Sequence, residues 1–228
     1  MMIISVVNEK GGSGKTSIAL NLSAKLHSLD KDLLLIDADP QNSTRVFNDI
    51  RACKEIPLSF PSASILGNSL ASQIKSLSEK YDYLIVDTGG RDSEDTRLAI
   101  SLSDILIIPT IPSDLDIAVL NKMLRLFTHT KLFNTKLKAF VVISKASPNP
   151  FLHAKLRDLQ EYINEKNIED CILSSSVLYE REAYRSSFSN GLSIFEYCKK
   201  TDKAYQDFEG FFEELIDCID KEKMSVAL

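Results

Sequence analysis

The stretch Lys10-Gly11-Gly12-Ser13-Gly14-Lys15-Thr16-Ser17 decides the fold of this chain, because it directly follows the apolar run at residues 3–7. An apolar strand, a glycine-rich loop and a helix N-terminus form the geometry that holds a polyphosphate. The backbone N–H groups of residues 11–16 can face phosphate oxygens, since glycine tolerates the φ and ψ values that this requires. We expect Lys15 to reach the β- and γ-phosphates and the Thr16 hydroxyl to bind Mg²⁺.

The loop departs from the usual pattern of glycine, four residues and Gly-Lys-Ser/Thr. Glu9 stands where the first glycine is expected, and a second lysine, Lys10, precedes the glycines. A glycine-rich turn with a solvated lysine is the simplest alternative. Two lysines that bracket three glycines between a strand and a helix favour the phosphate loop.

Length and composition predict one sizeable α/β domain that spans residues 1–228. The formal net charge of −5 gives no overall attraction to DNA, so any DNA binding requires a local basic patch. No apolar run approaches the ~18 residues of a membrane span, and the N-terminus does not resemble a signal peptide. The four scattered cysteines predict neither zinc nor an iron–sulfur cluster. We therefore expect a cytoplasmic protein.

Strand-like and helix-like segments alternate along the chain, which predicts a doubly wound, mostly parallel sheet with helices on both faces. After the loop, apolar runs predict strands at 33–36, 83–86, 105–108, 140–143 and 171–173, with a weak strand within 57–64. Pro109 is expected to close the run at 105–108. Ser113 with Asp116 predicts a capping box, and Asn149-Pro150 predicts another helix start. The last two helices are expected at about 180–189 and 202–221.

Three aspartates follow predicted strands, where ligands of open α/β sheets bind. Asp37 and Asp39 follow the second strand, and Asp87 follows four apolar residues in the pattern of a Walker B carboxylate. A strand-end aspartate by itself often only caps the next helix. Three of them that converge on one phosphate loop predict a Mg²⁺ site.

Several segments resemble the ParA/MinD group of nucleotide-switch ATPases. The loop itself is similar to that group's Lys-Gly-Gly-x-Gly-Lys-Thr signature. The resemblance continues through Asp37–Ser43, Asp87-Thr88-Gly89-Gly90, the proline-containing segment 108–116, Glu180–Tyr184 and Gly191–Glu196. Ser13 and the Gly89-Gly90 pair, where many members have valine and two prolines, are similar to the small ParF-like subgroup. These motifs span residues 3–196 in the family's order.

This resemblance implies a P-loop ATPase that uses ATP and Mg²⁺. Lys15 and Lys10 would bind phosphate, with Lys10 reaching the nucleotide of a second subunit in an ATP-dependent homodimer. Asp39 would orient the attacking water, and Gly90 would sense the γ-phosphate from a switch at residues 87–92. The remaining expected nucleotide contacts are Gly11, Gly12, Ser13, Gly14, Thr16 and Ser17, and the expected metal residues are Thr16, Asp37, Asp39 and Asp87.

DNA binding is the weaker inference. Basic residues in the C-terminal third lie near where related proteins carry a nonspecific DNA surface, and these are Arg181, Arg185, Lys199, Lys200 and Lys203. A solvated helix face explains them equally well. The acidic C-terminal segment at 209–220 would be repelled by anionic lipid, so we expect no membrane recruitment by this tail.

Four hypotheses remain at this point. The first is a partition ATPase that binds DNA nonspecifically in its ATP state, associates with the nucleoid and is stimulated by a ParB-like centromere-binding or other adaptor protein. The second is a related positioning or conjugation ATPase that moves a protein cargo or a transfer complex. A ligase or kinase for a small metabolite and a noncatalytic nucleotide-dependent scaffold are the third and fourth. The second lysine and the Asp-Pro-Gln segment at 39–41 argue against the metabolite enzyme.

Overall fold

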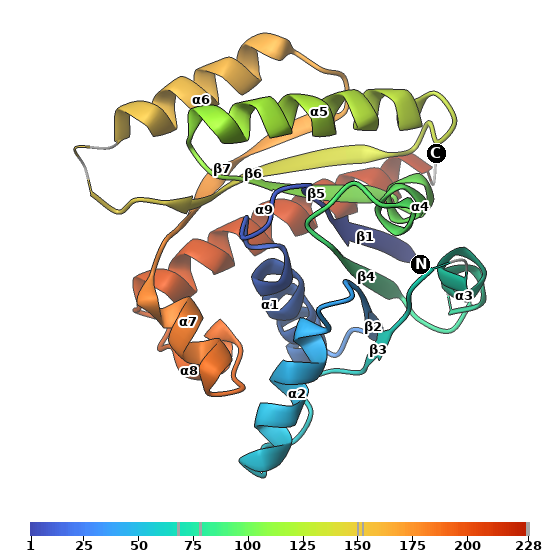
Figure 1. Cartoon of the computed structure of the whole chain (residues 1–228), viewed down its shortest axis with the longest axis vertical. Coiled ribbons are helices and arrows are strands. Elements are labelled where there is room, and N and C mark those ends of the chain that lie inside the picture. Colours follow the sequence, from blue (N-terminus) through green and yellow to red (C-terminus); the bar gives the residue numbers. More distant parts are fainter. Residues whose placement is uncertain (68, 78, 150, 152, 227–228) are drawn as a thin grey trace.

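The apolar runs of the sequence form the strands of one parallel sheet. The computed structural model describes residues 1–67, 69–77, 79–149, 151 and 153–226. Within them, seven strands lie in the order β3-β2-β4-β1-β5-β6-β7, and every neighbouring pair is parallel (Figure 1). Strands β1, β2, β4 and β5 are buried at every position, as expected where helices cover both faces. The strands are β1 Met2–Val6, β2 Leu33–Ala38, β3 Ser62–Ser64, β4 Tyr83–Thr88, β5 Ile105–Thr110, β6 Lys138–Ala146 and β7 Cys171–Tyr179.

Helices cover both faces of the sheet, which confirms the predicted doubly wound α/β fold (Figure 1). One face packs against α1 Lys15–Ser28, α2 Ser43–Cys53, α7 Glu182–Ser189, α8 Ile194–Tyr197 and α9 Lys203–Val226. The other packs against α3 Ser69–Leu77, α4 Glu94–Leu102, α5 Asp114–Lys131 and α6 His153–Lys166.

The strand order places β1 at the centre of the sheet, between β4 and β5. The chain leaves β1 toward β2 on one side and later crosses to β5, β6 and β7 on the other. Ligands of such sheets bind beyond the carboxyl ends of the strands at this crossing point. The loop after β1 therefore lies at the position that the topology favours for a ligand.

Two strands, β5 and β7, end later than predicted. Pro109 does not close β5, because the strand runs to Thr110 and Pro109 pairs with Val142 of β6. Its missing N–H would face β1, which ends at Val6, so the ladder loses no hydrogen bond. Strand β7 runs to Tyr179, well beyond the expected 171–173. Its serines at 174–176 are hydrogen-bonded to the Glu214 carboxylate of α9. The run of serines in the sequence does not predict this contact.

The predicted capping box at Ser113 is only half formed. The Ser113 hydroxyl accepts a hydrogen bond from the Asp116 N–H at 3.3 Å, but the Asp116 carboxylate bonds the Ser113 hydroxyl and Lys10 instead of the Ser113 backbone. A complete capping box occurs at Ser193 and Glu196 of α8. Asn149 accepts from the N–H of Phe151 at 3.1 Å, whereas Pro150 of the other predicted helix start lies outside the described residues.

The remaining helices match their predicted positions within a few residues. Helix α7 starts at Glu182 because β7 extends to Tyr179, and α9 runs on to Val226. Among the described residues, no helix combines the length and the apolar character that a membrane crossing needs.

Candidate nucleotide-binding site

The glycine-rich loop connects β1 to α1 and leaves the start of that helix open. Gly12 and Gly14 have φ values of 78° and 96°, in the left-handed region where a side chain would be strained. Gly14 precedes α1 without a side-chain cap, and the first turn of α1 contains no acidic residue. The free N–H groups and the dipole of α1 therefore face outward and favour an anion. The Ser144 hydroxyl of β6 donates to the Ser13 carbonyl at 2.8 Å and fixes the loop on the sheet.

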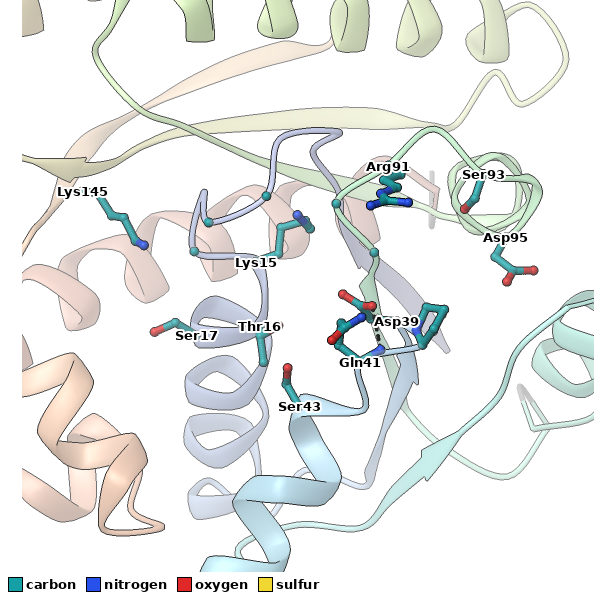
Figure 2. Close-up of a pocket in the computed structure, with 17 residues that line it drawn as sticks. Lys15, Thr16, Ser17, Asp39, Gln41, Ser43, Arg91, Ser93, Asp95 and Lys145 are labelled. Atoms are coloured by element: carbon teal, nitrogen blue, oxygen red, sulfur yellow. Dashed lines mark hydrogen bonds between the residues drawn. The ribbon is translucent and has the colours of Figure 1, made fainter.

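A cavity of about 690 Å³ lies over this loop (Figure 2). Its walls come from the phosphate loop, the segment after β2, the segment after β4 and the end of β6. Expected site residues gather here from separate parts of the chain: Gly11, Gly12, Gly14, Lys15, Thr16, Ser17, Asp39 and Gly90 line the cavity. The structure also adds Gln41, Ser43, Arg91 and Lys145, which the sequence did not single out as ligand contacts.

Lys15 is held among the carboxylates of the site. It is 6% exposed, and its Nζ donates to the Lys10 carbonyl at 3.1 Å. Burial lowers the pKa of Lys15, while the negative charges of Asp87 and Asp39 act in the opposite direction. Figure 2 shows its ammonium group pointing into the space between the loop and the segment that carries Arg91. A phosphate in the cavity would relieve the cost of this buried charge.

Asp87 is buried without a hydrogen bond of ordinary geometry to either carboxylate oxygen. Burial raises its pKa to about 7, whereas the Thr16 hydroxyl and Lys15 lower it and the charges of Asp37 and Asp39 add to the rise. Such an orphaned carboxylate near a hydroxyl fits a hydrated Mg²⁺ ion. Mg²⁺ typically takes only one or two protein ligands and keeps water and phosphate as the others.

Asp37 and Asp39 have different environments from Asp87. The Asp37 carboxylate accepts from the N–H groups of Asp39 at 3.0 Å and Thr44 at 2.9 Å, so it shapes the loop after β2. Asp39 accepts from the N–H of Gln41 at 3.0 Å and faces the cavity. The described residues contain no group of three or more His, Cys, Asp and Glu side chains that could hold a metal.

Gly90 touches the phosphate loop. A Cβ atom added at Gly90 would lie 3.0 Å from Gly11 Cα, 3.1 Å from Gly11 N and 3.5 Å from Lys15 Nζ. A side chain at this position would crowd the backbone of Gly11, so glycine at residue 90 favours the close approach of the segment after β4 to the loop. The predicted switch segment and the phosphate loop are thus in direct contact.

Lys10 points away from the cavity toward α5. Its Nζ lies 2.6 Å from Asp116 Oδ2, and Asp116 is 1% exposed while the Lys10 side chain is 34% exposed. The neighbouring Glu9 pairs with Lys122 of the same helix at 2.6 Å. Lys10 does not line the cavity that Lys15 lines. This placement makes Lys10 available to another molecule only if the pair with Asp116 is exchanged.

A second cavity of about 440 Å³ adjoins the first, and sequence reasoning missed it. The two share Gly14, Thr16, Ser17, Ser43 and Lys145. The second continues between the end of β7 and α7, where Tyr179, Tyr184 and Phe188 line it. Leu178 and Tyr179, at the end of β7, line this cavity. The predicted strand ended at residue 173, so the sequence did not indicate the cavity.

The five basic residues expected to contact DNA divide into two sets. Arg181 forms an ion pair with Asp207 at 2.5 Å and lines the second cavity. Arg185 is exposed and pairs with Glu180 and Glu182. Lys199, Lys200 and Lys203 are exposed and form no ion pair with any residue that the structure describes. The free positive charge of this region therefore lies near the start of α9.

Comparison with known proteins assigns the family. The sequence model of the CobQ/CobB/MinD/ParA nucleotide binding domain matches residues 4–194. The chain belongs to this family. It is 28% identical over 216 residues to the maintenance of carboxysome distribution protein A of Halothiobacillus neapolitanus, covering 93% of this chain and 95% of that protein.

Two solved structures share the fold of this family member. Apo McdA from Cyanothece has a TM-score of 0.73 at 21% identity, covering 94% of this chain and 99% of that one. A plasmid partition protein from Borrelia burgdorferi bound to AMPPNP has a TM-score of 0.69 at 20% identity, covering 95% and 98%. The chain is thus a nucleotide-binding protein of the ParA/MinD type, a family that includes ATPases such as the cell division ATPase MinD of Pyrococcus furiosus.

Proposed function

We propose that this protein is a Mg²⁺-dependent ATPase that acts as an ATP-driven dimerisation switch in DNA partition. The contact between Gly90 and Gly11 beside Lys15 carries the proposal. A γ-phosphate bound at Lys15 must be accommodated next to this contact, so its presence or loss would move the segment after β4. Movement of a loop with the γ-phosphate is the general basis of nucleotide switches.

The site residues have separate roles in hydrolysis of ATP to ADP and phosphate. Lys15 and the N-terminus of α1 bind the phosphates, and Thr16 with Asp87 would hold Mg²⁺. Bound there, the ion would neutralise part of the phosphate charge. Asp39 faces the cavity and would orient the attacking water, because a carboxylate is a weak base for water. We expect slow turnover that a ParB-like or other adaptor protein stimulates.

Lys10 would complete the nucleotide site of a second copy of the chain. Its pair with Asp116 keeps it outside its own cavity, and one third of its side chain is exposed. Lys10→Ala should therefore abolish ATP-dependent dimerisation, measured by light scattering after size-exclusion chromatography. The matched control is Lys136→Ala, an exposed lysine in the loop before β6 that lines neither cavity. An unchanged ATP-dependent dimer in Lys10→Ala would refute the shared site.

Nonspecific DNA binding in the ATP state would use the exposed lysines 199, 200 and 203. A mobility shift on random DNA with ADP, ATP and a nonhydrolysable analogue tests this role. We expect retardation only with the triphosphates, weakening steeply as salt is raised. Replacement of all three lysines by glutamate should abolish the retardation. Arg181 is not part of this proposed surface, because it is already paired with Asp207.

Positioning of a protein cargo is the second candidate function. The similarity to a maintenance of carboxysome distribution protein favours it, since that relative is matched over 95% of its length. Dimerisation without any DNA retardation at low salt would support a switch that acts on cargo without DNA. Retardation of DNA by the triphosphate form fits partition. A pull-down of the adaptor would then show whether the cargo is DNA or a protein.

A further inference from the structure

A lysine that belongs to neither the phosphate loop nor the segments carrying the site aspartates lies at the junction of the two cavities. Lys145 lines both cavities, at the end of β6. Its side chain is exposed and forms no ion pair with any described residue. Figure 2 shows the side chain extending from its strand toward the phosphate loop, on the side of the loop opposite to Arg91.

The backbone at Lys145 has an unusual conformation at an irregularity of β6. Its φ is 51°, in the left-handed region that lysine rarely adopts. The pairing of β6 with β7 shifts register between Ser144 and Ala146, which places this residue in an irregular turn of the strand. Residues in such conformations persist where surrounding structure fixes them, and they concentrate at ligand sites.

Neighbouring contacts fix the position of Lys145 relative to the phosphate loop. Ser144 is 3% exposed and donates to the Ser13 carbonyl at 2.8 Å. The end of β6 is therefore tied to the loop one residue before Lys145. The lysine is directed over the start of α1, where Gly14, Thr16 and Ser17 also border both cavities.

We infer that Lys145 binds the α-phosphate of the nucleotide. This inference rests on the proposed binding of the phosphates in the first cavity, with Lys15 at the β/γ end, and it adds that the base lies in the adjoining second cavity. A cation at the junction meets the part of the nucleotide that joins the phosphates to the nucleoside. ADP and ATP share this phosphate, so Lys145 strengthens both complexes equally, in contrast to a residue that contacts the γ-phosphate.

The test compares the affinities of ADP and of a hydrolysis-resistant ATP analogue by calorimetry. Lys145→Met keeps the aliphatic stem without the charge, and we expect a roughly tenfold loss for both nucleotides. Lys145→Arg keeps the charge and should bind within about threefold of the wild type. Wild-type affinity in Lys145→Met would overturn the inference, and so would a loss confined to the ATP analogue.

Lys145→Gly separates binding from folding. Glycine accepts a φ of 51° without strain, so the melting temperature without nucleotide should stay the same or rise while both affinities fall about tenfold. The matched control is Glu55→Gly, an exposed residue with a φ of 56° that lines neither cavity, and its affinities should not change. A lower melting temperature for Lys145→Gly together with weaker binding would indicate a structural role and overturn the inference.

The wild type itself distinguishes the two levels of the proposal. A wild-type protein that binds neither nucleotide would overturn the nucleotide site, and the role of Lys145 with it. A wild type that binds both, with variants that bind equally well, would overturn only the role of Lys145.

Discussion

The two lysines of the phosphate loop have opposite environments. Lys15 is 6% exposed, close to two carboxylates and directed into the cavity. Lys10 is half-buried against α5, paired with one aspartate and outside the cavity. A buried cation among carboxylates is fixed in place for a ligand of its own subunit, whereas a half-exposed ion pair can be exchanged for another partner. The two ends of one loop are therefore suited to two different binding events.

The largest expected effect is at Lys15. Lys15→Ala should weaken ATP binding to the monomer by about 100-fold, because charge-assisted hydrogen bonds to phosphate are lost in a site of low polarity. Lys10→Ala should change the same affinity by less than about threefold, since Lys10 does not line the cavity. Calorimetry at protein concentrations that keep the chain monomeric measures both. Equal losses in the two variants would contradict the division between them.

Asp39 comes next, because it faces the same cavity as Lys15. Asp39→Ala should lower ATP turnover by about 100-fold through loss of water orientation, with ATP affinity nearly unchanged. Phosphate release under single-turnover conditions provides the measurement. Hydrolysis at the wild-type rate would instead favour a noncatalytic scaffold.

A contact far from both lysines provides a reference for stability. Arg51 is 3% exposed and forms two hydrogen bonds of 3.0 Å with the Glu196 carboxylate. Because Glu196 is about one-third exposed, we expect Glu196→Gln to cost about 2 kcal/mol at pH 7, less than a fully buried pair. ATP affinity should not change, and chemical denaturation measures the free energy of unfolding.

The same pair predicts a pH dependence. Burial by itself would raise the pKa of Glu196, but hydrogen bonds from Arg51 and Ser193 outweigh it and hold the pKa below its usual value. The ionised form therefore stabilises the fold above the pKa of the unfolded chain, and this contribution is lost as pH falls through the folded pKa. The stability difference between wild type and Glu196→Gln should shrink below about pH 4.5. A constant difference down to pH 3 would contradict this.

The smallest expected effect is at Asp116. Asp116→Asn removes the ion pair of Lys10 but keeps the size of the side chain. Lys10 then leaves α5 at lower cost, so ATP-dependent dimerisation should strengthen by about fivefold. Sedimentation equilibrium with a nonhydrolysable analogue measures the change. A weaker dimer would show that Asp116 acts in the dimer itself and does not compete with it.

Much of the site could be predicted because it depends on short-range patterns. The alternation of apolar runs with helical segments predicted the parallel sheet, and the loop with its strand-end aspartates predicted the edge at which these residues meet. The early end expected for β7 shows the limit of such patterns. Ser174–Ser176 lie within β7, and their hydroxyl groups donate to the carboxylate of Glu214, about 40 residues later in the chain.

The environments of Lys10 and Lys15 were predicted in part, unlike the end of β7. The sequence by itself determined the family fold and the phosphate loop, because glycine conformations, charge and strand ends are local properties. Only the tertiary structure decided that Lys15 is buried beside Asp87 and that Lys10 pairs with Asp116. It also brought Gly90 against Gly11 and Lys145 to the junction of two cavities. These contacts join residues that are far apart along the chain, and packing of the sheet and helices is what sets their distances.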